Sequence, residues 1–131
     1  MIDIDHFKLL NDTYGHQQGD RMLRALAGIF QEATRESDMV ARYGGEEFSV
    51  VLPSTNLAGG KITAERIRSA VESHSFTHPG NPALSMTVSV GVAHYRGEGI
   101  EHPSDLVEQA DKALYRAKEQ GRNVTIIYGE F

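Results

Sequence analysis

Apolar residues recur along the first third of the chain with the periods of a strand and then of a helix. Ile2-Asp3-Ile4-Asp5 alternates apolar and acidic residues, which predicts a short half-buried strand with both acids on one side. Asn11 to Gly15 has the composition of a turn. An amphipathic helix is predicted next, opened by Gly19-Asp20. Its apolar stripe comprises Met22, Leu23, Leu26, Ile29, Phe30 and Ala33.

The middle of the chain predicts a hairpin followed by a second helix. Met39–Tyr43 and Glu47–Leu52 are rich in strand-forming residues and are separated by Gly44-Gly45. Two glycines at this point favour a tight hairpin, because glycine adopts positive φ without a steric penalty. Beyond Pro53, which ends the strand, the spacing of apolar residues predicts a helix over about Leu57–Ser73.

The last third predicts a strand, a helix and a closing strand. Ser85–His94 carries valines on one side of a predicted strand. Ser104 is a candidate N-cap for the helix that follows, and Gly121 is typical of a helix end. Val124–Tyr128 predicts the closing strand. The element order indicates an α+β, ferredoxin-like fold with a mostly antiparallel sheet and flanking helices, packed mainly on one face.

Length, charge and composition exclude several classes of function. The 131 residues suit one domain, and the net charge of −5 disfavours binding to a long nucleic acid, which is held mainly by cationic contacts to phosphate. The absence of cysteine excludes disulfides and thiolate chemistry. No apolar run approaches the roughly 18–20 residues needed to cross a bilayer, and the acidic start is unlike a signal peptide. We therefore expect a cytoplasmic domain without membrane contact.

Acidic residues gather at two places where a strand and a hairpin are predicted. These are Asp3 and Asp5 on the first strand, and Glu46 and Glu47 directly after Gly44-Gly45. Carboxylates on short strands can converge on a hard divalent cation such as Mg²⁺. Solvated acids at strand ends are the alternative interpretation, and the residue pattern alone leaves both open.

The glycine pair and two late cations also have two interpretations each. Gly44-Gly45 can be merely a tight turn, or its missing Cβ atoms can let a nucleotide lie against backbone N–H groups. Lys118 and Arg122 are four residues apart, so both could reach one polyphosphate. Cations at a helix C-terminus are, however, favoured by the helix dipole in any case.

Taken together, the motifs resemble the GGDEF family of diguanylate cyclases, in matching order and separation over nearly the whole chain. They are Asp3–Lys8 (DIDHFK), Asn11–His16 (NDTYGH), Gly19-Asp20, Arg42–Phe48 (RYGGEEF), Ala64–Arg68 (AERIR), Thr87–Val92 (TVSVGV), Ala110–Lys118 (ADKALYRAK) and Gly121–Asn123 (GRN). The resemblance implies a palm-like fold related to nucleotidyl cyclases and polymerases. It also implies that two GTP molecules condense into cyclic di-GMP, with loss of two pyrophosphates, between the facing subunits of a homodimer.

The resemblance implies roles for the acidic residues by their motif positions. Asp3 and Glu46 match metal-binding carboxylates, with the Ile4 carbonyl as a backbone ligand for Mg²⁺ or Mn²⁺. Glu47 matches the residue close to the metal and to the attacking hydroxyl. Glu46 stands where the family name has Asp, and either acid offers carboxylate oxygens. Asp5 matches a family position whose role, in contact with a second metal or in ordering the site, is left open.

Further positions match nucleotide-binding sites of the family. Asn11 and Asp20 match the pair that recognises guanine, whose ring N–H and exocyclic amine suit a carboxylate acceptor. The substrate-binding set implied is Asn11, Asp20, Phe7 (through its backbone N–H), Lys8, Gly44, Gly45, Lys118 and Arg122. Arg35 and Asp38 match the family's RxxD inhibitory product site, and Arg66 matches its additional arginine. We therefore expect feedback inhibition by cyclic di-GMP.

One departure from the family pattern concerns the start of the chain. The family domain normally begins upstream with a helix and the start of the first strand, which connect to a regulatory module, whereas Met1 falls inside that strand. We expect residues 1–131 to be a single GGDEF domain that lacks both. An alternative is a binding module that no longer turns over GTP and senses cyclic di-GMP or GTP.

Overall fold

Five strands form one mixed sheet in the computed structural model, which describes residues 1–131. They are β1 (Ile2–Ile4), β2 (Met39–Arg42), β3 (Glu47–Val51), β4 (Val88–Val92) and β5 (Thr125–Ile127), in the spatial order β2-β3-β1-β4-β5. All neighbours are antiparallel except β4 and β5. A parallel pair needs a crossover connection, which is supplied here by helix α4 (Pro103–Glu119). The predicted α+β class with a mostly antiparallel sheet is confirmed.

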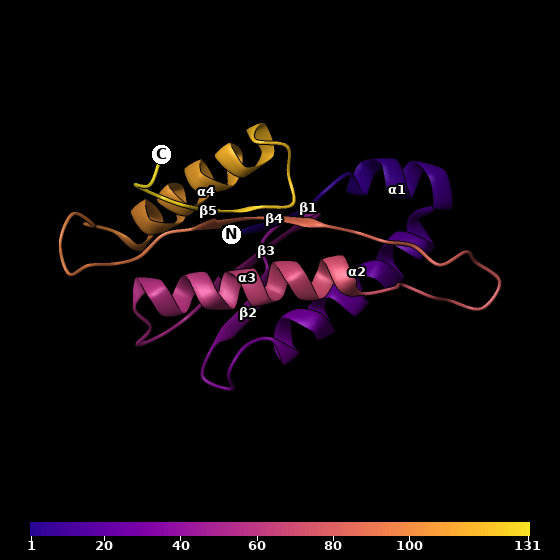
Figure 1. The fold of residues 1–131 in the computed structure, drawn as a ribbon, viewed down its shortest axis with the longest axis horizontal. Coiled ribbons are helices and arrows are strands. Elements are labelled where there is room, and N and C mark those ends of the chain that lie inside the picture. Colours follow the sequence, from indigo (N-terminus) through magenta and orange to yellow (C-terminus); the bar gives the residue numbers. More distant parts are fainter.

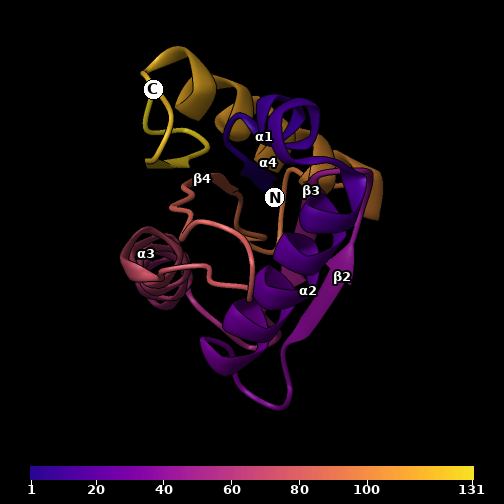
Figure 2. The same cartoon turned by 90° about the vertical axis from the view of Figure 1, so that its right-hand side faces the viewer.

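Helices cover both faces of this sheet. The other three are α1 (Phe7–Tyr14), α2 (His16–Glu32) and α3 (Leu57–Ser73). Figure 1 shows α2 and α3 below the strands and α4 above them, and Figure 2 shows α3 from its end with α2 running lengthwise beside β2. The expectation that the helices lie mainly on one face is therefore wrong for α4. None of the four helices combines the length and apolar character needed to cross a bilayer.

The alternation of side chains along β4 explains the two layers. Val88 and Val90 are buried in the main core with residues of α2 and α3, where the rings of Phe30 and Phe48 meet edge to face at 5.0 Å. The intervening Gly91 faces α4, and a Cβ there would overlap the backbone of Ala110 and Leu114. The absence of a side chain at Gly91 therefore lets the backbone of α4 approach β4 closely.

Strand β1 follows the predicted alternation but is buried on both sides. Ile2 and Ile4 belong to the main core, and Asp3 and Asp5 lie on the opposite side of the strand. Both acids are also buried, with exposures of 5% and 7%. The predicted half-buried strand is wrong in this respect, because α4 and the turn that follows it cover the acidic side.

Two helices in the N-terminal third differ from the sequence prediction. Asn11 to Gly15 is not a turn: residues up to Tyr14 belong to α1, and only Gly15, at a φ of 88°, separates α1 from α2. The apolar signal of α1 is short, since Phe7 is buried and Leu10 packs partly against the core, whereas Leu9 and most of the polar residues are exposed. Helix α2 begins at His16, so Gly19 lies inside it.

The later elements match their predictions except at some boundaries. Helix α3 has the predicted bounds, and the Asn56 side chain caps it by accepting the Gly59 N–H at 2.8 Å. Helix α4 begins at Pro103 rather than after Ser104, because the Asp105 carboxylate accepts the backbone N–H groups that precede the helix. Strands β4 and β5 are shorter than predicted, and α4 ends just before Gly121.

Candidate active site

The acids of the β2–β3 hairpin lie beside the acids of β1. Asp3 pairs with Glu47 in the antiparallel register of β1 and β3, and the Ile4 N–H donates to the Glu46 carbonyl at 3.2 Å. From the other side, Lys118 of α4 donates from Nζ to Asp3 Oδ2 at 2.8 Å. The structure therefore brings together a strand, a hairpin and a helix that are far apart in the sequence.

The electrostatics of this site disfavour a negative charge on Glu46. Burial raises the pKa of the Glu46 carboxyl above its ordinary value, and the nearby Asp3 and Glu47 charges raise it further. Lys118 acts in the opposite direction. The site consequently has more carboxylate charge than its single lysine balances, which is the situation that a bound cation relieves.

The donor atoms around Asp3 fit a hard divalent cation. Asp3 and Glu46 offer carboxylate oxygens, and the backbone at Ile4 offers a carbonyl, all of the kind that Mg²⁺ prefers. One Asp3 oxygen is engaged by Lys118. No group of three or more His, Asp or Glu side chains is gathered in a metal-binding arrangement, so a cation here would need backbone, water or substrate oxygens as well.

The Gly44-Gly45 hairpin forms without the positive φ angles on which its prediction is based. Neither Gly44 nor Gly45 has a positive φ, so the reason for expecting glycine there is wrong although the hairpin exists. The loop is held by Arg42, which donates from Nε to the Gly44 carbonyl at 3.1 Å and from Nη2 to the Gly45 carbonyl at 2.7 Å. A Cβ at Gly45 would meet nothing within 4 Å. The missing side chain therefore leaves open surface beside Glu46.

Asn11 and Gly19 make a close approach between α1 and α2. A Cβ at Gly19 would overlap Asn11 Oδ1 and lie 3.3 Å from the Phe7 ring. Asn11 Oδ1 is buried and has no hydrogen-bond partner within the chain, which is uncommon for a polar atom. Asp20, the next residue after Gly19, is exposed.

The remaining predicted nucleotide contacts have no partners within the chain. Phe7 begins α1 directly after His6, which has a φ of 57°. The first N–H groups of a helix have no intrahelical acceptor. The side chains of Lys8 and Arg122 are both exposed and make no hydrogen bond or ion pair. Of the predicted cations, only Lys118 is therefore joined to the acidic centre.

Asp5 is held by protein donors, which bears on the role left open above. Its carboxylate accepts from the hydroxyls of Thr87 at 2.6 Å and Ser89 at 2.7 Å and from the backbone N–H of Asn123 at 3.0 Å. These contacts join β1, β4 and the turn after α4. Sequence reasoning missed Ser89 and Asn123 as parts of the site, although Ser89, polar between two valines of a buried strand, was a usable signal.

Arg35 and Asp38 form a compact unit between α2 and β2. The Arg35 N–H donates to Asp38 Oδ2 at 2.8 Å, and Arg35 Nη2 reaches Thr55 Oγ1 at 2.6 Å. The Asp38 side chain is only 2% exposed and that of Arg35 is 58% exposed. Arg66 donates to the Ala33 carbonyl at 3.1 Å, near the end of α2. All three predicted residues thus meet around the end of α2, away from the acidic centre.

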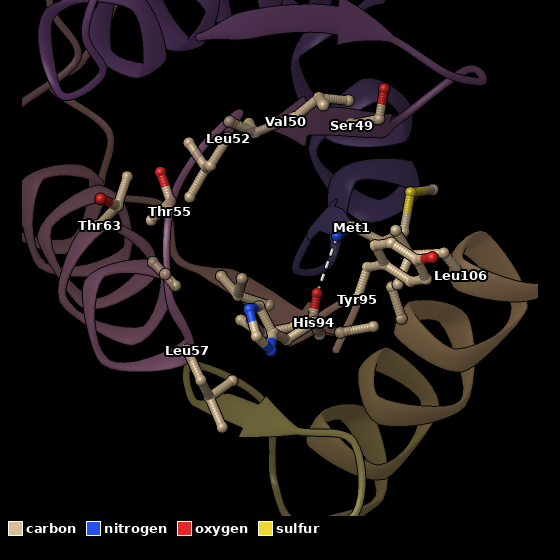
Figure 3. Close-up of a pocket in the computed structure, with 18 of the residues that line it drawn as sticks. Met1, Ser49, Val50, Leu52, Thr55, Leu57, Thr63, His94, Tyr95 and Leu106 are labelled. Carbon is tan, nitrogen blue, oxygen red and sulfur yellow. Dashed lines mark hydrogen bonds between the residues drawn. The ribbon is translucent and has the colours of Figure 1, made fainter. Parts of the chain in front are cut away.

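A separate, mostly apolar pocket of about 460 Å³ lies elsewhere in the molecule. It lies among the ends of β3 and β4 and the starts of α3 and α4, as Figure 3 shows. None of the candidate site residues lines it. Its one unsatisfied polar atom is Nδ1 of His94. The apolar pocket is thus distinct from the acidic centre around Asp3 and Glu46.

Comparison with known sequences gives a family match and close relatives. The sequence model described as "Diguanylate cyclase, GGDEF domain" matches residues 1–124. Diguanylate cyclase A of Treponema denticola is 48% identical over 123 residues, which are 94% of this chain and 33% of that protein. The response regulator PleD of Caulobacter vibrioides is 45% identical over 127 residues, 96% of this chain and 28% of PleD. The chain thus spans about a third or less of these relatives.

Solved structures give the same result for the fold. The GGDEF domain of DgcB from Caulobacter crescentus, determined in complex with c-di-GMP, superimposes with a TM-score of 0.88 and 38% identity, covering 97% of this chain and 74% of that chain. The active GGEEF domain of a diguanylate cyclase from Vibrio cholerae gives a TM-score of 0.87 and 37% identity, with coverages of 99% and 81%. The palm-like fold is therefore established, and the chain belongs to the GGDEF domain family of diguanylate cyclases.

Proposed function

We propose that this domain condenses two GTP molecules into cyclic di-GMP and two pyrophosphates. The observation that carries the proposal is the convergence of Asp3, Glu46 and Lys118 beside the open Gly44-Gly45 loop. A carboxylate pair with excess charge, one lysine and accessible backbone suits a nucleoside triphosphate accompanied by a divalent cation. Residues 1–131 are the proposed catalytic domain.

The acidic residues divide between holding a cation and moving a proton. Asp3, Glu46 and the Ile4 carbonyl would hold Mg²⁺ or Mn²⁺. When bound, this ion neutralises phosphate charge and favours ionisation of the attacking hydroxyl. Glu47 lies beside Asp3 in the sheet register and takes the proton from the 3′-hydroxyl. The 3′-oxygen then bonds to the α-phosphorus of the other GTP as the bond to pyrophosphate breaks.

The nucleotide is held at both ends by residues outside the acidic centre. Asn11 Oδ1, buried and without a partner, accepts from the guanine exocyclic amine, and the exposed Asp20 carboxylate accepts from the ring N–H. At the other end, Lys118 and Arg122 neutralise the triphosphate, with Lys8 and the backbone N–H of Phe7 at the start of α1. Gly44 and Gly45 allow the nucleotide to approach the hairpin backbone.

Two copies of the domain are required by this chemistry. Each copy holds one GTP, and each 3′-hydroxyl attacks the α-phosphate held by the facing copy, so that two bonds close the ring. A homodimer, at least a transient one, therefore belongs to the mechanism. The DgcB domain of known structure was determined in complex with c-di-GMP, which supports a dinucleotide as a ligand of this fold.

Arg35, Asp38 and Arg66 form the proposed product-inhibition site. The two guanidinium groups offer donors to phosphate and to the Hoogsteen edge of guanine, and the aspartate accepts a guanine N–H. In the free protein Asp38 is occupied by Arg35. Binding of cyclic di-GMP would thus exchange this internal pair for contacts with the ligand, at a distance from Glu47.

The direct experiment incubates the protein with GTP and Mg²⁺ and detects cyclic di-GMP. The Glu47→Ala variant should form none, because the proton acceptor is gone. Lys112→Gln, which removes an exposed ion pair with Glu108 on α4, is the matched control and should retain activity. Absence of product from a verified wild-type dimer would contradict the proposal.

Product formation, measured together with binding by titration calorimetry, separates an enzyme from a non-catalytic sensor. Both would bind cyclic di-GMP through Arg35, so Arg35→Ala should weaken that binding in either case. Only the enzyme also forms product from GTP and loses its feedback inhibition when Arg35 is replaced. Unchanged product affinity in Arg35→Ala would show that the inhibitory site is wrongly assigned.

A further inference from the structure

The turn after α4 has three consecutive residues in the left-handed region. Gly121, Arg122 and Asn123 have φ values of 104°, 68° and 47°. The first part is an ordinary helix end, because Gly121 N–H donates to Lys118 O at 3.3 Å and Arg122 N–H to Ala117 O at 3.0 Å. Left-handed backbone at a residue such as Arg122 costs about 1–2 kcal/mol. Contacts from elsewhere must therefore hold this turn.

Those contacts converge on Asn123. Arg68 Nη1 donates to Asn123 Oδ1 at 2.9 Å, and Asn123 Nδ2 donates to Glu72 Oε2 at 2.9 Å. Its backbone N–H is bound by Asp5, as described above. The side-chain amide is thus fixed at both ends by α3, and the backbone is fixed by β1. Both the side chain and the backbone of Asn123 are therefore restrained. This restraint also fixes the backbone position from which the neighbouring Arg122 side chain extends.

The Arg68 side chain is itself held in one geometry. Its Nη1 donates to Glu72 Oε2 at 2.6 Å, and its Nε donates to Glu65 Oε1 at 3.2 Å. The side chain is 19% exposed. Isolated ion pairs on a helix surface contribute little to stability, but here both partners of the Arg68–Glu72 pair also reach across to the turn. The pair is consequently part of a network that links α3 to the Arg122–Asn123 turn beside the active site.

We propose that Arg68 and Glu72 are positioning residues that hold the Arg122–Asn123 turn for the triphosphate of the substrate. They act through Asn123 and touch no substrate themselves. The proposal rests on the proposed function, since Arg122 is a phosphate ligand only if GTP binds as described. A pre-organised turn presents the Arg122 guanidinium without an ordering penalty at binding, whereas a loosened turn must be ordered by the nucleotide.

Amide hydrogen exchange in the nucleotide-free protein tests the structural half of the proposal. In Arg68→Gln and Glu72→Gln, the amides of residues 122–124 should exchange about tenfold faster than in the wild type. Lys112→Gln should leave them unchanged. Glu72 has a side chain that is 49% exposed, so its replacement keeps the test available if Arg68→Gln does not fold. Unchanged exchange in a folded variant would overturn the proposal.

Nucleotide binding tests the functional half. With Mg²⁺ present, both variants should bind GTP about five- to tenfold more weakly while their affinity for GMP stays unchanged, because only the phosphate end is loosened. A purely structural role would weaken GTP and GMP equally and would overturn the proposal. A wild-type protein that binds GTP no more tightly than GMP would overturn the proposed function as well. A GTP-selective wild type with equally selective variants would overturn the positioning role alone.

Discussion

Asp5 Oδ2 accepts the backbone N–H of Asn123 at 3.0 Å, across 118 positions of the sequence. The contact joins the first strand to the turn that follows the last helix. With Thr87 and Ser89 bound to the same carboxylate, Asp5 is surrounded by donors. We infer that Asp5 orders the active site rather than remaining free to bind a second cation.

Replacing Asp5 should destabilise the fold strongly. Asp5→Ala leaves three donors without their acceptor in a buried position and should lower the free energy of unfolding by about 3 kcal/mol. Urea unfolding at neutral pH measures this change. Asp12→Asn, at an exposed position of α1, is the control and should change stability by less than about 0.5 kcal/mol. Equal effects of the two variants would contradict the assigned role.

Two glycines of α2 should respond in opposite directions to alanine. A Cβ at Gly19 would overlap Asn11 Oδ1, whereas a Cβ at Gly28 would meet nothing within 4 Å. Gly19→Ala should therefore destabilise the protein by about 1–3 kcal/mol and weaken guanine nucleotide binding. Gly28→Ala should stabilise it by up to about 1 kcal/mol, because alanine is the better helix former. Thermal unfolding and GTP titration check both, and a harmless Gly19→Ala would refute the close approach.

The hairpin glycine should matter for binding and not for folding. Gly45 has no positive φ, and its Cβ would enter open space. Gly45→Ala should thus leave the unfolding midpoint nearly unchanged but reduce GTP affinity, since the methyl group would occupy the nucleotide's approach to the backbone. GTP titration of the folded variant provides the measurement. Wild-type affinity would show that the nucleotide does not lie against this loop.

Glu46 should lower stability at neutral pH when no divalent cation is present. Burial and the Asp3 charge raise its pKa in the folded state, so the native protein binds more protons than the unfolded chain. Stability then falls as pH rises through the interval between the two pKa values. In EDTA, Glu46→Gln should lack this loss and be more stable at pH 7, by less than about 1 kcal/mol because the group is partly solvated. Lower stability of the variant at pH 7 would contradict this.

The sequence predicts the elements that carry the site wherever their apolar periodicity is clear. Helix α3 and the valine face of β4 follow from their apolar spacing. Helix α1 does not, because its two inward residues are too few to outweigh the turn-like composition of Asn11 to Gly15. The Arg68–Asn123 contact could not be predicted, since it joins polar residues on separate elements and depends on how α3 and the final turn meet.

The central claim is that two copies of this domain join two GTP molecules, and product stoichiometry against protein concentration tests it most directly. Cyclic di-GMP and pyrophosphate are quantified in one reaction with Mg²⁺ across a dilution series. The account predicts two pyrophosphates for each cyclic di-GMP and a specific activity that rises with protein concentration, as a reaction between facing copies requires. Pyrophosphate without cyclic di-GMP, or no product where a dimer is verified, would contradict it.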